Sequence, residues 1–258
     1  MKRGFSLVEL SIVLVILGLL TGGILAGQSL IRASELRSIS ADFQRYIAAT
    51  HTFRDKYMGL PGDLRTAINF WGDDVAACTD GNAANNGTPG TCNGDGNGQV
   101  LQGGGGATAE PAQYWKQLAL AGLIEGSYTG IAGAGSGYHA VIGTNAPRSR
   151  IPTAGFSVWW WGAYLGNANI FDGGYGNMMG FGTACANSVA ECPAIKPEEA
   201  WNVDTKMDDG KPATGNVRQR TIASAVAPDC ITTDTPSTST YKFTVTTNAC
   251  PLLFVTNY

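Results

Sequence analysis

The segment that decides the fold of this chain is MKRGFSLVELSIVLVILGLLTGGILAG, residues 1–27. Two basic residues, Lys2 and Arg3, precede a long apolar run that contains one acidic residue, Glu9. A membrane-spanning helix needs about 20 apolar residues, whereas the apolar core of a cleaved secretory signal has about 7–15. The stretch Leu10–Gly27 has the length of the first class. We therefore predict a membrane helix that is retained in the mature protein.

The acidic side chain inside this helix needs a partner of opposite charge. An acid at the centre of a spanning helix costs about 2.5–3.5 kcal/mol on insertion scales. A bare amine is also costly in hydrocarbon, and pairing the two across subunits neutralises both and fixes their axial register. Glu9 is expected to form such a pair. The competing interpretation is an ordinary signal anchor with a stray acid.

The order Gly4-Phe5-Ser6-Leu7-Val8-Glu9, behind a basic leader, resembles the processing site of type IV pilins and of the pseudopilins of type II secretion. The resemblance implies that a prepilin peptidase cuts between Gly4 and Phe5 and methylates the new amine of Phe5. It also implies that Glu9 pairs with this amine on a neighbouring subunit. The resemblance is strong at the start of the chain and loose beyond it.

By the same resemblance the fold class is α+β and pilin-like, with a long N-terminal helix packed on an antiparallel sheet. Residues 1–4 are then the leader, 5–27 the apolar polymerisation helix, 28–58 its amphipathic continuation and 59–258 a globular head with large glycine-rich loops. The continuation is supported by apolar residues that recur every three or four positions, among them Leu36, Ile39, Phe43, Tyr46, Phe53 and Tyr57. A glycine cap is expected to end the helix at Met58-Gly59.

Within the head we predict short helices and short strands. Residues Glu110–Glu125 have helical spacing, with a proline near the start where a helix tolerates one. Shorter helical turns are expected at 63–71 and after Lys196. Strands are predicted where β-branched and aromatic residues are bounded by glycine, at His139–Ile142, Gly155–Leu165, Ile170-Phe171, Val217–Val226 and Tyr241–Thr246.

All six cysteines lie in the head, which indicates disulfides in an oxidising compartment. Fifteen connectivities are open to six cysteines. The positive-inside rule places Lys2 and Arg3 in the cytoplasm. The chain is expected to cross the bacterial inner membrane once, with its head in the periplasm, and then to join a pilus or pseudopilus. Sequence proximity favours the disulfides Cys78–Cys92, Cys185–Cys192 and Cys230–Cys250.

No organic cofactor is expected, but two acidic stretches offer the oxygen ligands that calcium prefers. Asn93, Asp95 and Asn97, followed by Gly98, resemble the front half of a calcium loop. Gly104 stands where such a loop has its bidentate acid, and plain turn chemistry is the alternative. The second candidate set lies in the C-terminal part of the head, where related pseudopilins carry calcium, and consists of Asp204, Asp208 and Asp209.

Composition and motifs argue against two classes of function. The net charge is −3 and there is no basic cluster, so nucleic acid is not an expected partner. The two histidines, His51 and His139, are not accompanied by a nucleophile elbow, a phosphate-binding loop or a His-Glu-x-x-His motif. We therefore predict no enzyme activity. The expected partners are other copies or related pilin subunits, the prepilin peptidase and the inner membrane.

The predicted function is that of a pilin, minor pilin or pseudopilin in a type IV pilus or type II secretion-type filament. One alternative is an adhesive head at a filament tip, with Trp159-Trp160-Trp161 in its contact surface. Because successive strand residues face opposite sides, at least one of these tryptophans is expected to point away from the core. A loop that covers it is the simpler interpretation. The other alternative is a membrane-anchored periplasmic domain that never assembles.

Overall fold

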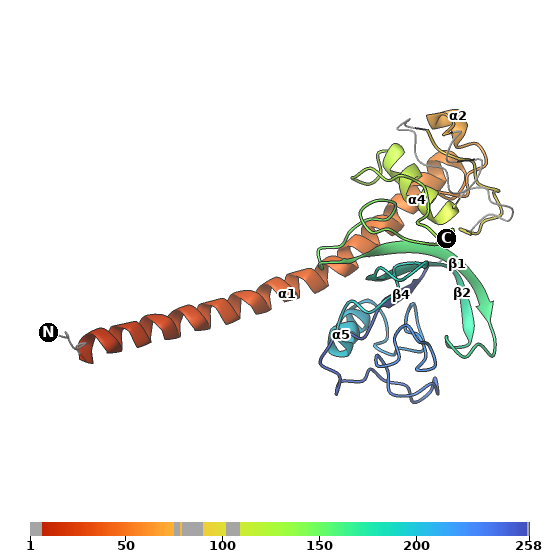
Figure 1. Cartoon of the computed structure of the whole chain (residues 1–258). Helices are drawn as coiled ribbons and strands as arrows, with labels where there is room; N and C mark the ends of the chain where they lie inside the picture. The colour runs from red at the N-terminus through yellow and green to blue at the C-terminus, as the bar shows by residue number, and fades with distance from the viewer. Residues whose placement is uncertain (1–6, 75–77, 79–89, 102–108, 257) are drawn as a thin grey trace.

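A computed structural model of the chain describes residues 7–74, 78, 90–101, 109–256 and 258. One long helix, α1 (Leu7–Tyr57), reaches out from a mixed helical and sheet head (Figure 1). Its 51 residues span about 75 Å at 1.5 Å per residue. The buried residues of α1 lie in its C-terminal half, from Ser38 to Phe53. The N-terminal half of the helix extends away from the head (Figure 1).

The end of α1 differs from the expected glycine cap. Met58, not Gly59, takes the left-handed backbone conformation that stops the helix, with φ of 59°. A Cβ added to Gly59 would lie 2.8 Å from Cδ1 of Leu64, so this glycine allows the following turn to pack closely. The helix therefore ends where the sequence predicts, but Gly59 serves close packing rather than capping.

Four strands form one antiparallel sheet in the order β1-β2-β4-β3. The long pair is β1 (Ala154–Tyr164) and β2 (Gly173–Thr183), which curve across the head together (Figure 1). The short strands are β3 (Val217–Arg218) and β4 (Leu252–Val255), and β4 lies between β2 and β3. A long apolar helix followed by an antiparallel sheet confirms the predicted α+β, pilin-like class.

The strand predictions are correct for β1 and wrong at several other places. Neither His139–Ile142 nor Tyr241–Thr246 forms a strand, and Val217–Val226 shortens to the two residues of β3. Ile170 makes only an isolated bridge, to Arg220. The apolar alternation at Tyr241 and Phe243 does not mark the buried face of a strand, because Tyr241 is buried, with 2% of its surface exposed, while Phe243 is 55% exposed.

The described part of the head also contains three short helices, α2 (Ile68–Trp71), α4 (Glu110–Leu120) and α5 (Pro197–Met207). Helix α4 ends earlier than predicted because Gly122 turns into the left-handed region, with φ of 70°. Helix α5 begins with proline, and the carboxylate of Glu199 accepts the backbone N–H of Lys196 at 2.9 Å as a cap.

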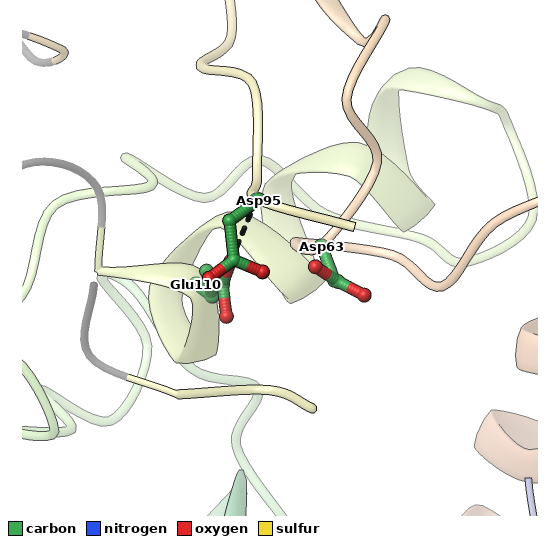
Figure 2. A group of neighbouring side chains, drawn as sticks. All are labelled: Asp63, Asp95 and Glu110. Atoms are coloured by element: carbon green, nitrogen blue, oxygen red, sulfur yellow. Dashed lines mark hydrogen bonds between the residues drawn. The ribbon is translucent and has the colours of Figure 1, made fainter. Parts of the chain in front are cut away.

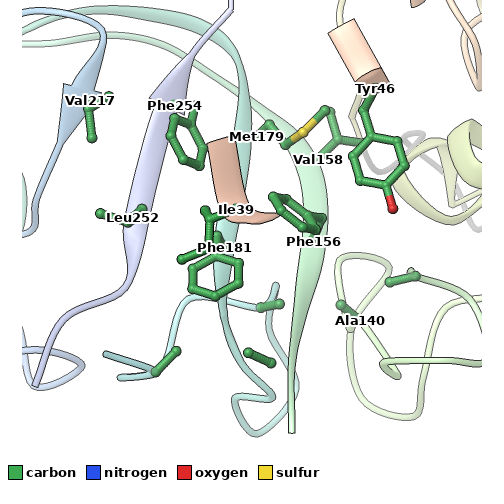
Figure 3. Packing of buried hydrophobic residues seen from close by; sticks show 14 of the residues in the cluster. Ile39, Tyr46, Ala140, Phe156, Val158, Met179, Phe181, Val217, Leu252 and Phe254 are labelled. Atoms are coloured by element: carbon green, nitrogen blue, oxygen red, sulfur yellow. The ribbon is translucent and has the colours of Figure 1, made fainter. Parts of the chain in front are cut away.

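The core lies between the C-terminal half of α1, the sheet and α4. Ile39 of α1 lies beside Phe156 and Phe181 of the long strand pair (Figure 3). The ring of Tyr46 packs edge-on against Trp115 of α4 at 5.0 Å and against Phe156 of β1 at 5.2 Å between centroids. Burial of each large side chain contributes about 1.5–3 kcal/mol. The buried face of α1 thus packs against both the sheet and α4, and so holds these two parts of the head together.

Three disulfides join the cysteines that are nearest in sequence. The pairs are Cys78–Cys92, Cys185–Cys192 and Cys230–Cys250, the same pairs that sequence proximity favours. Each closes a short loop, and a native disulfide typically adds about 2–4 kcal/mol to the stability of a domain. The last one joins Cys230 to the segment that directly precedes β4.

Candidate functional site

The N-terminal half of α1 has apolar side chains on its whole circumference. Leu7, Leu19 and Leu30 expose 86%, 72% and 71% of their surfaces. The helix is long and apolar enough to cross a membrane, by length and composition. Monomeric soluble proteins rarely expose apolar patches of this extent, so the surface is suited to lipid or to other copies of the same helix.

The few hydroxyl groups on this half of α1 are satisfied by the helix itself. The hydroxyl of Ser11 donates to the carbonyl of Val8 at 2.9 Å, and that of Thr21 donates to the carbonyl of Leu17 at 2.9 Å. Hydrocarbon offers no hydrogen bonds, so a polar group there must find its partner within the protein. These contacts make the apolar half compatible with a membrane despite its serine and threonine residues.

The acid predicted to serve assembly lies at the start of this surface. Glu9 is in the first turn of α1 and is exposed to the surroundings of the helix. The predicted processing residues, Gly4 and Phe5, lie outside the described residues, and so does the leader. At four glycines of the apolar half, an added Cβ would meet no atom within 4 Å: Gly18, Gly22, Gly23 and Gly27. Packing within the single chain therefore does not require glycine at these positions.

A profile of the prokaryotic N-terminal methylation motif matches residues 1–25. This chain carries the N-terminus of a prepilin. The motif is the hallmark of the precursors of type IV pilins and pseudopilins, and the match confirms the resemblance drawn from Gly4 to Glu9. The comparison with curated proteins gave no match, and neither did the comparison with solved structures. A pilin-type N-terminus indicates a structural protein rather than an enzyme.

In the structure, the first predicted calcium stretch lies against two acids that are not part of the predicted set, Asp63 and Glu110. The carboxylates of Asp63, Asp95 and Glu110 offer oxygens that lie within 4.8 Å of one another (Figure 2). Asp63 accepts backbone N–H groups from Asn97 at 3.1 Å and from Gly98 at 2.8 Å. Asp63 therefore holds the turn at residues 95–98 in place. In the sequence, the one indication of this role is that Asp63 directly follows the turn residues Leu60-Pro61-Gly62.

Glu110 anchors the other side of the same loop. It accepts the backbone N–H groups of Asp95 at 3.2 Å and of Leu101 at 2.8 Å. Burial raises the pKa of Glu110 to about 7, although the two N–H groups partly offset that effect. Burial also raises the pKa of Asp63 above its usual value. Both acids lie beneath the loop and bind its backbone.

The two asparagines of this stretch have separate roles in the structure. The side-chain oxygen of Asn93 accepts the backbone N–H of Ile68 at 3.0 Å, at the start of α2. The side-chain amide of Asn97 donates to Asp95 at 2.8 Å. The first cluster of acids in the structure thus differs from the predicted set. Tertiary contacts bring Asp63 and Glu110 to Asp95, whereas Asn93 binds the start of α2 instead.

The second predicted calcium set is brought together after α5. Oxygens of Asp204, Asp208 and Asp209 lie within 4.8 Å of one another. Asp204 is fully buried and accepts the hydroxyl of Tyr241 at 2.7 Å and the N–H of Gly210 at 3.1 Å. Burial, with a smaller contribution from the two neighbouring acids, raises the pKa of Asp204 to about 7. The three carboxylates are therefore mutually repulsive when all are ionised.

The outer two acids of this set also organise the chain locally. Asp208 accepts the backbone N–H of Val217 at 3.2 Å, and Asp209 accepts the hydroxyl of Thr214 at 2.6 Å. A carboxylate oxygen that accepts one hydrogen bond retains a further lone pair. Three carboxylates in one turn fit the oxygen preference of calcium, so calcium at this position stays a prediction.

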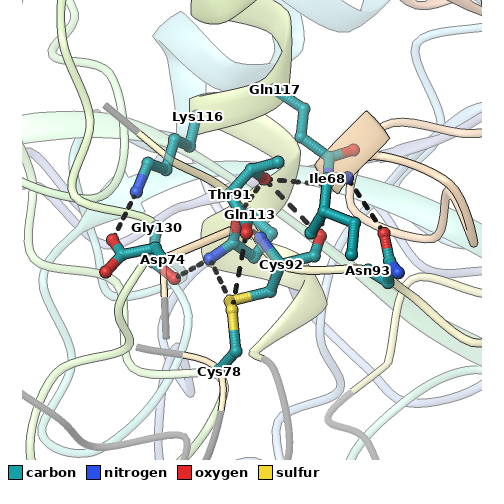
Figure 4. The surroundings of a disulfide bond; sticks show 10 residues. All are labelled: Ile68, Asp74, Cys78, Thr91, Cys92, Asn93, Gln113, Lys116, Gln117 and Gly130. Atoms are coloured by element: carbon teal, nitrogen blue, oxygen red, sulfur yellow. Dashed lines mark hydrogen bonds and ion pairs between the residues drawn. A yellow bond between two sulfur atoms is a disulfide. The ribbon is translucent and has the colours of Figure 1, made fainter. Parts of the chain in front are cut away.

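The described residues near the first disulfide are held to α4 by buried polar contacts (Figure 4). Gln113 accepts the hydroxyl of Thr91 at 2.8 Å and donates to the carbonyl of Gly130 at 2.9 Å. Lys116 forms an ion pair with Asp74 at 2.9 Å, with 6% and 0% of the two side chains exposed. Breaking one partner of a buried pair typically costs about 3–5 kcal/mol, so these contacts are structural anchors.

Neither histidine belongs to a catalytic arrangement in the described part of the chain. His51 on α1 packs edge-on against Tyr258, with 6.3 Å between ring centroids. A ring nitrogen of His139 is 2.8 Å from the carbonyl oxygen of Ala134. Both contacts are local packing.

Proposed function

We propose that the chain is a structural subunit of a type IV pilus or a type II secretion-type filament, and that it assembles through the apolar half of α1. The observation that carries the proposal is the junction of a prepilin motif at residues 1–25 with a fully exposed apolar helix in the same segment. Lipid covers this helix before assembly, and neighbouring copies cover it afterwards. Burial of apolar surface at about 25 cal/mol per Å² favours both states over exposure to water.

Glu9 is proposed to select the register between copies. An ionised carboxylate is costly in hydrocarbon, and the processed chain has a positive amine at Phe5, close to the same end of the helix. In a staggered assembly the amine of one subunit reaches Glu9 of the next. The pairing neutralises both charges in an environment where each alone is unfavourable.

Mass spectrometry of the mature N-terminus tests the processing step. We expect the wild-type chain to begin with an N-methylated Phe5 and Gly4→Ala to keep its leader. Gly18→Ala is the matched control, because an added Cβ there meets no atom within 4 Å, and it should be processed normally. A mature protein that begins downstream of the apolar helix would overturn the proposal.

Assembly is tested separately with Glu9→Val, which should insert into the membrane but fail to appear in sheared filaments. Ser11→Ala, which lies in the same part of the helix, is expected to assemble like the wild type. Immunogold labelling then separates the two kinds of filament protein. Label along the shaft is expected for a structural subunit, whereas label at tips alone would favour an adhesive head.

A further inference from the structure

The β1–β2 pair contains two irregularities that gather aromatic side chains on one face. Trp161 on β1 and Tyr175 on β2 have no partner in the pairing register. Each strand therefore has a one-residue bulge, and the two bulges lie close together. The two extra rings meet edge-on, with 5.6 Å between centroids. Bulges change the direction of a side chain and are over-represented next to functional sites. Here they build an aromatic cluster rather than a regular alternation.

Four aromatic rings of this cluster make a continuous surface. Trp161 packs edge-on against Trp159 at 5.3 Å and against Tyr164 at 5.9 Å between centroids. Trp159 is buried with 2% of its surface exposed, while Trp161 and Tyr164 are half-buried. Trp160 is also half-buried. The half-buried rings line a cavity of about 410 Å³ together with Trp159.

The other wall of the cavity is polar but carries no net charge. Arg220 and Glu191 form an ion pair with 12% and 5% of their side chains exposed, and Ser188 donates to Glu191 at 3.1 Å. The Arg220 guanidinium also lies over the ring of Trp161, 4.7 Å from its centroid. The cation is therefore already matched by a carboxylate and a ring face. Additional negative charge on a ligand would compete with both contacts.

The polar wall retains hydrogen-bonding capacity beyond its internal contacts. Arg220 donates to Glu191 through Nε and Nη2, whereas a guanidinium has five N–H donors. The hydroxyl of Ser188, which donates to Glu191, can still accept a hydrogen bond. A molecule that carries hydroxyl groups can meet both kinds of group, so it suits this wall better than a purely apolar one.

We propose that this cavity binds a neutral pyranose sugar. A pyranose combines an apolar C–H face, which suits the negative face of an aromatic ring, with hydroxyl groups around its edge. The rings supply the platform, and Ser188, Glu191 and Arg220 supply the polar contacts. A volume of about 410 Å³ lies within the range of about 300–1,000 Å³ that is typical of small-molecule sites. An aliphatic ligand would make no use of the remaining hydrogen-bonding capacity of this wall.

The test uses the full-length chain in a polyoxyethylene detergent, because alkyl-glycoside detergents would present sugars themselves. The probes are glucose, galactose, mannose and N-acetylglucosamine at millimolar concentration, followed by saturation-transfer NMR from the aromatic protons. We expect at least one of these sugars to receive saturation, and Trp161→Ala to weaken its binding about tenfold or more.

Two further variants keep the result interpretable. Tyr164→Ala truncates a half-buried ring and should weaken binding without disturbing the fold, as judged by an unchanged far-ultraviolet dichroism spectrum and a cooperative unfolding transition. Trp201→Ala removes an exposed tryptophan of α5 that does not line the cavity, and binding should be unchanged. No saturation of any of the four sugars, or saturation that persists in Trp161→Ala, would overturn the proposal. The experiment does not require filaments, so its outcome is independent of the assembly proposal.

Discussion

Arg32 of α1 and Glu199 of α5 form two parallel hydrogen bonds, from Nε to Oε1 and from Nη2 to Oε2, each of 2.7 Å. The same guanidinium donates to Glu35 at 2.9 Å. Glu199 in turn caps α5 by accepting the N–H of Lys196. One arginine therefore joins α5 to the rod close to where the buried face of α1 begins, at Ser38.

Removing this arginine should loosen the head. We expect Arg32→Ala to lower the free energy of unfolding by about 1.5–3 kcal/mol, because bidentate charged hydrogen bonds are stronger than neutral ones and Glu199 loses its countercharge. Arg54→Ala removes an exposed arginine from the same helix and should change stability by less than about 0.5 kcal/mol. Urea unfolding of the micelle-bound chain measures both, and equal effects of the two variants would contradict the assignment.

The Arg32 contact should also depend on pH. Burial by itself would raise the pKa of Glu199, but the hydrogen bond from Arg32 and the Lys196 N–H outweigh burial and lower it. A lowered pKa in the folded state stabilises the protein above the ordinary glutamate pKa of about 4.3 and ceases to do so as the pH falls through the folded value. The difference between wild type and Arg32→Ala should therefore shrink in acid.

Asp204 should give the opposite pH dependence. Its pKa in the folded protein is about 7, above the ordinary value, so it stabilises the protein fully below about pH 4 and progressively less up to pH 7. The free energy of unfolding of the wild type should therefore fall between pH 4 and pH 8. In Asp204→Asn we expect this fall to be smaller by about 2–4 kcal/mol. Thermal unfolding at several pH values measures this slope.

A residual slope should remain in that variant, because Glu110 also has a pKa of about 7. Adding Glu110→Gln to Asp204→Asn is expected to flatten the profile further. A wild-type protein whose stability rises steadily from pH 4 to pH 7 would contradict the assignment of both groups.

Calcium should bind the turn after α5 when its acids are ionised. We expect heat in a calorimetric titration with Ca²⁺ at pH 8 and less at pH 5, because Asp204 is then protonated. Asp208→Asn should abolish the heat. Asp55→Asn is the matched control, because this exposed acid of α1 belongs to neither group of clustered carboxylates. No heat at pH 8 would end the calcium prediction for Asp204, Asp208 and Asp209.

One glycine of β2 should be intolerant of any side chain. A Cβ added at Gly180 would lie 2.6 Å from the six-membered ring of Trp159, whereas one added at Gly174 on the same strand meets nothing within 4 Å. We expect Gly180→Ala to destabilise the head by about 1–3 kcal/mol through overpacking. Gly174→Ala should be near neutral. Equal melting temperatures for the two variants would show that the Trp159 ring moves aside without cost.

The helices were largely predictable because their signals are local. The apolar run of α1, its amphipathic continuation and the proline at the start of α4 all act through neighbouring residues along one helix. Strand β2 was not predictable, because five glycines in GGYGNMMGFGT conceal its alternation. Gly180 and Gly176 lie against the rings of Trp159 and Trp160 of β1, and only the pairing of the two strands reveals this. Strand β4, with four residues, carries too short a pattern.

The sequence by itself determined the prepilin N-terminus, the rod and the class of the fold, since hydrophobic length, charge order and helical period are properties of contiguous residues. Only the tertiary structure decided which acids meet and which aromatic rings share a face. Asp63, Asp95 and Glu110 come from three separate segments, and the cluster around Trp161 depends on a bulge in each of two strands. Such contacts arise from packing between distant segments, and no local pattern encodes them.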